Sequence, residues 1–191
     1  MEAIGRLLEN KVILITGAAG SIGSEMVKQI ALFKPERLVL IDQSETPMHD
    51  VRLYMKKNYP YIDCETIVAS ITNAERMEYV FRMHRPDYVF HAAAYKHVPM
   101  MEDNPAEAVQ NNIYGTRVIA DMAVKYSAKK FVMISTDKAV NPTNVMGCSK
   151  RICEIYCQSL NKAIVDGEIP GITQFVTTRF GNVLGSNGSV I

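Results

Sequence analysis

Several features are missing from this 191-residue chain, and each absence excludes a class of protein. No run approaches the roughly 18 consecutive apolar residues that a membrane-spanning helix needs, and no apolar segment follows a basic head at the start, as in a secretory signal. No long block of one charge occurs, and the 21 basic side chains nearly balance the 20 acidic ones. Neither nucleic acid nor an anionic membrane surface is therefore expected as a partner.

Metal-ligand spacing is also missing around the four cysteines, Cys64, Cys148, Cys153 and Cys157. There is no CxxC pair and no nearby histidine, and Cys153 and Cys157 stand four residues apart on one face of an expected helix. We therefore predict no metal site and interpret the cysteines as buried, reduced thiols. Reduced thiols and the missing signal predict a cytoplasmic location.

The apolar content, 48% of the residues, is enough for one domain with a sizeable core. The run at residues 12–15 predicts a strand buried on both faces of a parallel sheet. Gly17, Gly20 and Gly23 then open a helix. Such glycines allow a tight turn, close approach of a pyrophosphate and close packing of the helix, whose N-terminus attracts phosphate. An ordinary structural turn is the alternative.

A second apolar run, residues 38–41, ends in Asp42, nineteen residues after Gly23. A carboxylate at this place accepts the hydroxyls of the adenosine ribose in dinucleotide-binding folds. Its charge would repel a ribose 2′-phosphate, so Asp42 favours NAD over NADP. A neighbouring cation would still permit NADP.

The rest of the chain alternates apolar strands with helices, without an internal repeat, a linker or a low-complexity tract. This alternation predicts an α/β fold: a Rossmann-type, doubly wound parallel sheet of at least six strands in three layers, α/β/α, which forms a dinucleotide-binding domain over residues 1–191. The further strands are expected near residues 66–69, 88–91, 130–134 and 175–178. The further helices are expected around residues 51–55, from a cap at Asn73 to about residue 84, and over residues 105–126 and 149–165.

Small and polar residues follow these strands, at the edge on which an open α/β sheet binds its ligands. Ser70 and Ile71 follow the third strand, and Ala92, Ala93 and Ala94 follow the fourth. Three small side chains at a strand exit leave room for a flat cofactor ring or a ribose.

The fifth expected strand leads into Thr136, Asp137 and Lys138, which places a hydroxyl, an acid and a base at the same edge. Lys150 follows at the start of the next expected helix. A solvated strand end and an ordinary helix lysine are the alternative, but the glycine loop at the same edge favours a reaction centre.

These motifs resemble those of the extended short-chain dehydrogenase/reductases: Thr16-Gly17-x-x-Gly20-x-x-Gly23, His91-Ala92-Ala93-Ala94, Asn112, and Lys150 where a Tyr-x-x-x-Lys motif ends. Three longer strings are similar to the polysaccharide-biosynthesis (CapD-like) branch of nucleotide-sugar 4,6-dehydratases: HAAAYKHVPMMEDNP from His91, STDKAVNPTNVMGCSK from Ser135 and RFGNVLGSNGSVI from Arg179. The resemblance covers essentially the whole chain and implies a UDP-N-acetylglucosamine 4,6-dehydratase of bacterial surface polysaccharide biosynthesis.

The resemblance implies an internal redox cycle, in which NAD takes hydride from carbon 4 of the sugar, water leaves across carbons 5 and 6, and the hydride returns to carbon 6. Thr136 would bond the carbon-4 oxygen, Asp137 would protonate the departing carbon-6 hydroxyl, and Lys138 would remove the carbon-5 proton. These roles are chemically reasonable, because a 4-keto group acidifies the neighbouring C–H and a desolvated lysine can act as a base.

Met146 stands where the wider family has its tyrosine base, and a thioether cannot take a proton. A subgroup of these dehydratases resembles this chain in carrying methionine, so the position does not imply inactivity. Lys150 would hold the nicotinamide ribose and lower nearby pKa values by its charge. Lys150 and a water relayed through Thr136 are our two hypotheses for the base that acts at carbon 4.

The resemblance also assigns binding residues. Those expected at the cofactor are Gly17, Gly20, Ser21, Ile22, Gly23, Asp42, Ser70, Ile71, Ala92, Ala93, Ala94, Asn112 and Lys150. Those expected at the substrate are Lys96, His97 and Asn182, with solvated loop residues as the alternative for the first two. Arg179 is open between a role in the site and a role as a structural ion-pair partner.

The partner implied by the resemblance is a UDP-sugar. The resemblance also implies a sugar-nucleotide domain after Ile191, a membrane-anchored region before residue 1 in longer members, and a homo-oligomer formed through the two long helices that follow the fourth and fifth strands. Two alternatives to the dehydratase stay open. A UDP-N-acetylhexosamine 4-epimerase needs no acid and base at carbons 5 and 6, and a non-catalytic NAD-binding module is supported by Met146 alone.

Overall fold

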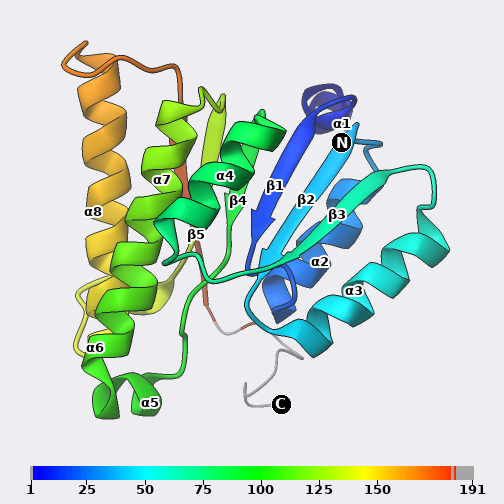
Figure 1. Ribbon diagram of the computed structural model, residues 1–191. Helices are drawn as coiled ribbons and strands as arrows, with labels where there is room; N and C mark the ends of the chain where they lie inside the picture. Colours follow the sequence, from blue (N-terminus) through cyan, green and yellow to red (C-terminus); the bar gives the residue numbers. More distant parts are fainter. Residues whose placement is uncertain (1, 182, 184–191) are drawn as a thin grey trace.

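The computed structural model describes residues 2–181 and 183, and its centre is a six-stranded sheet (Figure 1). The strands are β1 (Val12–Thr16), β2 (Arg37–Asp42), β3 (Asp63–Val68), β4 (Tyr88–His91), β5 (Lys130–Thr136) and β6 (Gln174–Phe180). All neighbours pair in parallel, in the order β3-β2-β1-β4-β5-β6. The order changes direction between β1 and β4, as in the doubly wound Rossmann-type sheet that the sequence predicts.

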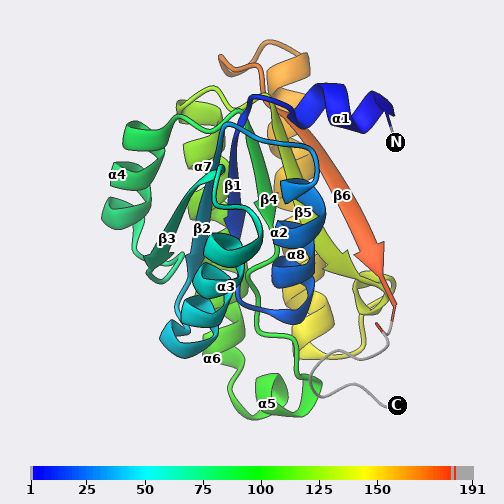
Figure 2. The same cartoon turned by 90° about the vertical axis from the view of Figure 1, so that its right-hand side faces the viewer.

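Helices cover both faces of this sheet, so the prediction of three layers is confirmed (Figures 1 and 2). α2 (Ser21–Ala31) and α3 (Glu45–Asn58) cover one face, with the end of the short α1 (Glu2–Leu8) beside them. α4 (Ala74–His84), α7 (Gly115–Lys125) and α8 (Val145–Val165) cover the other face. Successive side chains of β1 alternate between the two cores, Ile13 toward α2 and Leu14 toward α7, and both are fully buried.

Shorter helical segments connect these elements near the carboxyl ends of the strands, at the lower edge of Figure 1. They are α5 (Val98–Asp103), α6 (Pro105–Glu107), the π-helix η1 (Ala108–Tyr114) and the 3-10 helix η2 (Asp137–Ala139). The segment predicted as one long α-helix over residues 105–126 is therefore α6, η1 and α7, because a turn with i→i+5 hydrogen bonds interrupts it.

Helix and strand ends were predicted less well than their centres. α8 begins at Val145 rather than near Ser149, because the side chain of Asn144 accepts a hydrogen bond from Gly147 N at 2.7 Å and caps the helix earlier. β5 continues to Thr136, so the strand includes residues that were expected to follow it. The predicted cap of α4 is confirmed, since Asn73 accepts a hydrogen bond from Arg76 N at 2.9 Å.

The four cysteines carry free thiols. Cys153 and Cys157 are buried as predicted, Cys64 is half-buried, and the prediction is wrong for Cys148, which is exposed on the outer side of α8. Within residues 2–181 and 183, no three His, Cys, Asp or Glu side chains are grouped to hold a metal ion. None of the described helices is long and apolar enough to cross a membrane.

Candidate functional site

A glycine turn follows β1 and packs tightly against its surroundings. Gly17 has a φ of 69°, and a Cβ on it would lie 2.5 Å from the backbone nitrogen of Ala93. A Cβ on Gly23 would lie 1.9 Å from the carbonyl oxygen of Gly17. Glycine is therefore needed at both positions: Gly17 takes the left-handed backbone conformation of the turn, and Gly23 allows α2 to approach the turn closely. No side chain caps α2, and the N–H groups of a first helical turn have no partner within their helix, which suits a phosphate.

A cavity of about 240 Å³ lies beside this turn, at the carboxyl ends of β1, β2 and β4. The strand order changes direction here, which is where open α/β sheets bind ligands. The predicted cofactor residues that line the cavity are Gly17, Gly20, Asp42, Ile71, Ala92, Ala93 and Ala94. Ser21, Ile22 and Gly23 form the first turn of α2. Ser70, Asn112 and Lys150 are outside the cavity lining.

The carboxylate of Asp42 is held in place by two backbone N–H groups. Oδ2 accepts from Ala19 N at 3.0 Å, and Oδ1 accepts from Ser44 N at 2.9 Å. Each carboxylate oxygen can accept a second hydrogen bond, so Asp42 can still receive two ribose hydroxyls.

Two consecutive asparagines of η1 have different environments. Asn112 is fully buried, and its side chain accepts from Tyr95 N at 2.8 Å and donates to Tyr95 O and to Ser149 Oγ at 3.0 Å each. Asn112 therefore ties the loop after β4 to α8. Asn111 lines the cavity and donates to Asn112 Oδ1 at 3.2 Å. Asn111 was not predicted as a site residue, and its signal in the sequence is the adjoining Asn112.

A buried histidine joins the ends of two central strands. His91 is fully buried, with its Nδ1 atom 2.7 Å from Thr16 Oγ1 and its Nε2 atom 2.9 Å from Thr116 Oγ1. Burial, with a smaller contribution from the charge of Lys150, lowers the pKa of His91 to about 3. His91 is therefore neutral and fixes the carboxyl edge of the sheet beside the cavity.

Thr136, Asp137 and Lys138 form a cluster at the carboxyl end of β5. The hydroxyl of Thr136 donates to Asp137 Oδ1 at 2.9 Å and accepts from Lys138 N at 3.3 Å, while Lys138 Nζ lies 3.4 Å from Asp137 Oδ1. The hydrogen bond from Thr136, and then the contacts with Lys138, lower the pKa of Asp137. Asp137 is therefore ionised at neutral pH in this state.

Lys150 and Met146 both lie in the first two turns of α8 and are both buried, with 5% and 3% of their surface exposed. Burial lowers the pKa of Lys150, although Cys153, Cys157 and Glu154 oppose the shift. Met146 packs against Met101 and Ala108 in a small apolar cluster. The position that carries tyrosine in the wider family is thus a packing position here.

The predicted substrate residues do not form a cluster like that of Thr136, Asp137 and Lys138 among the described residues. Lys96 and His97 are exposed in the loop between β4 and α5, and neither lines the cavity beside the glycine turn or the cavity on the outer side of α8. Asn182 lies outside the described residues. Arg179 takes the ion-pair role, because its Nε and Nη2 atoms donate to Glu154 Oε1 and Oε2 at 2.8 and 2.7 Å.

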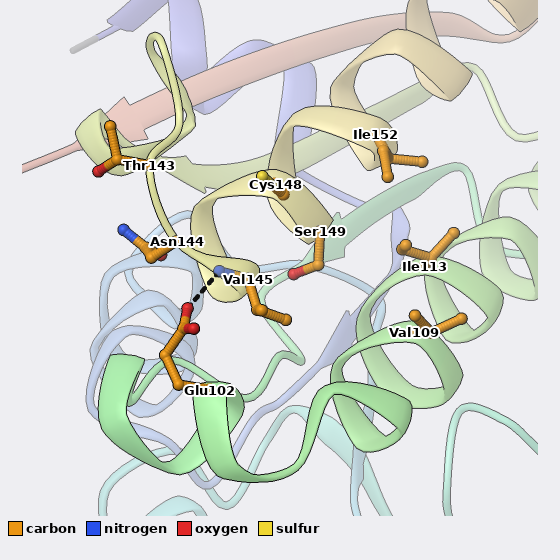
Figure 3. Close-up of a pocket in the computed structure, with 9 residues that line it drawn as sticks. All are labelled: Glu102, Val109, Ile113, Thr143, Asn144, Val145, Cys148, Ser149 and Ile152. Carbon is orange, nitrogen blue, oxygen red and sulfur yellow. Dashed lines mark hydrogen bonds between the residues drawn. The ribbon is translucent and has the colours of Figure 1, made fainter.

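A second cavity, of about 360 Å³, opens on the outer side of α8 (Figure 3). Glu102 of α5 closes one end, where its Oε1 atom accepts from Val145 N at 2.6 Å. Val109 and Ile113 of η1 face Ile152 of α8 at the other end (Figure 3). This cavity could not be predicted from the sequence, because its shape depends on how η1 and α8 pack against each other.

Comparison with known proteins shows that the chain is similar to polysaccharide biosynthesis proteins and to nucleotide-sugar dehydratases and epimerases. Residues 13–191 match the model of the family described as "Polysaccharide biosynthesis protein". The chain is 48% identical over 192 aligned positions to the capsular polysaccharide biosynthesis protein CapD of Staphylococcus aureus, covering 100% of this chain and 31% of that protein. It is 32% identical to an inverting UDP-N-acetylglucosamine 4,6-dehydratase of Campylobacter jejuni, covering 97% and 53%. It is 35% identical to a UDP-glucose 4-epimerase of Rickettsia massiliae, covering 95% and 52%.

Among solved structures, the chain superimposes on Pen from Bacillus thuringiensis with a TM-score of 0.88 and 32% identity, covering 96% of this chain and 55% of that one. The chain thus spans between about a third and about half of the length of these proteins. The family match covers most of the chain, including the glycine turn and the cluster at the end of β5. The chain therefore belongs to the polysaccharide biosynthesis protein family of extended short-chain dehydrogenase/reductases.

Proposed function

We propose that this chain is the NAD-binding domain of a UDP-N-acetylglucosamine 4,6-dehydratase in surface polysaccharide biosynthesis. The observation that carries the proposal is the cluster of Thr136, Asp137 and Lys138, in which the hydroxyl of Thr136 and the amine of Lys138 lie 2.9 and 3.4 Å from Asp137 Oδ1. Elimination of water across carbons 5 and 6 needs an acid and a base at those carbons, whereas epimerisation at carbon 4 needs no acid or base at carbons 5 and 6. The similarity to the Campylobacter jejuni dehydratase supports the same reaction.

The glycine turn and the neighbouring cavity fit a nicotinamide dinucleotide. Gly17 and Gly23 have no room for a Cβ, and the pyrophosphate would lie against the first turn of α2. Asp42 would accept the ribose hydroxyls and repel a 2′-phosphate, which favours NAD over NADP. When bound, NAD supplies a group that takes a hydride from the sugar and returns it.

The residues of the cluster would act in sequence on the sugar. Thr136 would turn its hydroxyl from Asp137 to the carbon-4 oxygen. Loss of that hydrogen bond removes the main cause of the lowered pKa of Asp137. Burial of the carboxyl group under the bound sugar would raise the pKa further, so that Asp137 would hold a proton taken from solvent and give it to the departing carbon-6 hydroxyl. Lys138, shielded from water by the sugar, would take the carbon-5 proton.

Lys150 would bind the nicotinamide ribose, and it remains one of two hypotheses for the base at carbon 4. Met146 cannot take this role. Full turnover in a Lys150→Met variant would exclude the lysine and leave the water relayed through Thr136.

The test is mass spectrometry of the product after incubation of UDP-N-acetylglucosamine and NAD with the chain and with a polypeptide extended beyond Ile191. Loss of one water establishes the dehydratase, and loss in the extended form alone shows that a domain after Ile191 is required. An isomerised sugar of unchanged mass supports the 4-epimerase, which the similarity to the Rickettsia massiliae protein favours. If the mass and structure of the nucleotide sugar stay unchanged, and the added sugar does not alter the absorbance of the bound cofactor, the chain is a non-catalytic NAD-binding module.

The proposal also includes the contacts with the substrate, the oligomeric state and the location. Lys96, His97 and Asn182 would contact the UDP-sugar. A homo-oligomer would form through the outer face of η1, α7 and α8, where Val109 and Ile152 are 53% and 46% exposed. The location would be cytoplasmic.

A further inference from the structure

Glu154 is a fully buried carboxylate in α8 and lies outside both cavities. Its Oε1 atom accepts from Ser135 Oγ at 2.7 Å and from Arg179 Nε at 2.8 Å. Its Oε2 atom accepts from Arg179 Nη2 at 2.7 Å and from Arg151 Nη1 at 3.0 Å. Four donors satisfy the lone pairs of an ionised carboxylate, so Glu154 keeps its charge in the interior.

The partners of Glu154 come from the ends of two strands. Ser135 and Arg179 are register partners in the parallel pair of β5 and β6, one residue before each strand ends. α8 packs against both strands (Figure 2). Glu154 therefore joins three elements, α8, β5 and β6, at the edge of the sheet where the proposed chemistry takes place.

The residues that are proposed to react follow directly after the contact of Glu154 with Ser135 at the end of β5. Thr136 follows Ser135, and Asp137 follows Thr136. On the neighbouring strand, the chain past Arg179 runs beside Asp137, since a Cβ on Gly181 would lie 3.8 Å from Asp137 Oδ2. A shift of either strand end against α8 would thus move the hydroxyl of Thr136 and the carboxylate of Asp137.

We propose that Glu154 is a positioning residue, whose buried carboxylate holds the ends of β5 and β6 against α8 and so places Thr136 and Asp137 for the reaction. The catalytic part of this inference rests on the proposed dehydratase function. The structural part does not, because it concerns only contacts within the chain.

The structural part is tested by hydrogen exchange in a Glu154→Gln variant, in the natural polypeptide that contains this chain. We expect faster amide exchange at the ends of β5 and β6 and unchanged exchange in β1 and β2. The matched control is Glu78→Gln, which removes a carboxylate that pairs with Lys125 at 2.6 Å between α4 and α7. Unchanged exchange at the ends of β5 and β6 in folded Glu154→Gln would overturn the inference.

The catalytic part is tested by steady-state kinetics of the same two variants. A displacement of reacting groups by about 1 Å costs about 100-fold in rate, so kcat should fall by 10- to 100-fold in Glu154→Gln while KM stays within about threefold. Glu78→Gln should keep both constants. Equal kcat in Glu154→Gln and the unaltered enzyme would refute the positioning role, and the proposed function would stand.

Neutralising a buried carboxylate that two arginines pair with is destabilising, so two further variants keep the test decisive. Glu154→Met combined with Arg179→Met removes both charges and should recover thermal stability relative to Glu154→Gln, while kcat stays low. A merely structural role predicts that kcat recovers together with stability, and this result would refute the inference. Ser135→Ala keeps the ion pair and should lower kcat by a smaller factor than Glu154→Gln.

The outcomes separate the inference from the proposed function. If the unaltered polypeptide removes no water from UDP-N-acetylglucosamine, the dehydratase proposal is wrong, and the catalytic part of the inference falls with it. The exchange comparison still decides whether Glu154 holds the strand ends.

Discussion

Gly23 offers a sharp test of the dinucleotide turn, because a single methyl group there meets backbone rather than a movable side chain. In a Gly23→Ala variant the new Cβ would lie 1.9 Å from the carbonyl oxygen of Gly17, whereas real Cβ contacts are essentially never shorter than 3.0 Å. Helix α2 must therefore move away from the turn by about 1 Å.

This movement should reduce both stability and cofactor affinity. Forcing one methyl group into a packed contact costs about 1–3 kcal/mol of folding free energy. The first turn of α2 would also leave its place at the pyrophosphate. Losing one hydrogen bond to a charged group costs about 2 kcal/mol, which weakens NAD binding by about 30-fold.

The assay is isothermal titration of NAD, paired with thermal unfolding of the unliganded chain. Gly20→Ala is the matched control, because its Cβ would lie 3.3 Å from Gly17 O, and a shift of a few tenths of an ångström relieves that contact. We expect Gly20→Ala to lose less affinity and stability than Gly23→Ala. If Gly23→Ala bound NAD as tightly as the unaltered chain, the glycine turn would not be the pyrophosphate site.

Four other perturbations test separate parts of the interpretation. Burial alone would raise the pKa of Glu154, but hydrogen bonds from Arg179, Ser135 and Arg151 hold it at about 2, below its ordinary 4.5. Ionised Glu154 thus stabilises the fold above about pH 4.5, and this contribution is lost as the pH falls toward 2. Between pH 4.5 and 2, the urea midpoint of the unaltered chain should therefore fall more than the urea midpoint of Glu154→Gln. Asp42→Ala should weaken NAD binding by about tenfold and NADP binding less, which competition titration would measure. Lys150→Met should lower turnover, through loss of the proposed contact with the nicotinamide ribose, without lowering the thermal midpoint, because it removes a buried ammonium group. Ile152→Asp should dissociate the proposed homo-oligomer, measured by light scattering, and leave NAD binding intact.

The central strands and the glycine turn were predictable because their signals are local. A continuous apolar run such as residues 12–15 fits a strand that helices cover on both sides, and β1 is buried accordingly. The change from that strand to three glycines also requires no knowledge of the rest of the chain. The strand pairing then brings Asp42 and Ala92 beside the turn, as the alternation of strands and helices implies.

The asparagines of η1 show where local patterns stop being sufficient. The apolar spacing over residues 105–126 fits an α-helix, but a π-helical turn changes which side chains face inward. Asn111 consequently reaches the cavity, while Asn112 packs against Tyr95 and Ser149. A period of 3.6 residues does not predict which of these two neighbours reaches the cavity, because the π-helical turn rotates the side chains relative to an α-helix.

Glu154 could not be predicted for a different reason. A glutamate within a helix is usually exposed, and its burial here depends on donors from β5 and β6 that are distant in sequence. The prediction left Arg179 open between two roles, and only the meeting of β6 with α8 decides for the ion pair.

Met146 stands where the resemblance to the wider family implies a tyrosine base, and its side chain packs there instead. Its side chain is 3% exposed and lies against Met101 and Ala108, so the first turn of α8 is held by apolar contact. A tyrosine in the same place would bring a hydroxyl into that cluster, and burying it without a partner would be costly. The polar groups that could handle protons are instead Lys150 on α8 and the cluster at the end of β5, and Glu154 of α8 accepts a hydrogen bond from Ser135 of β5. For that reason we expect Met146→Tyr to change stability more than turnover, and a large gain in turnover with unchanged stability would mean that the base is missing from this chain rather than replaced.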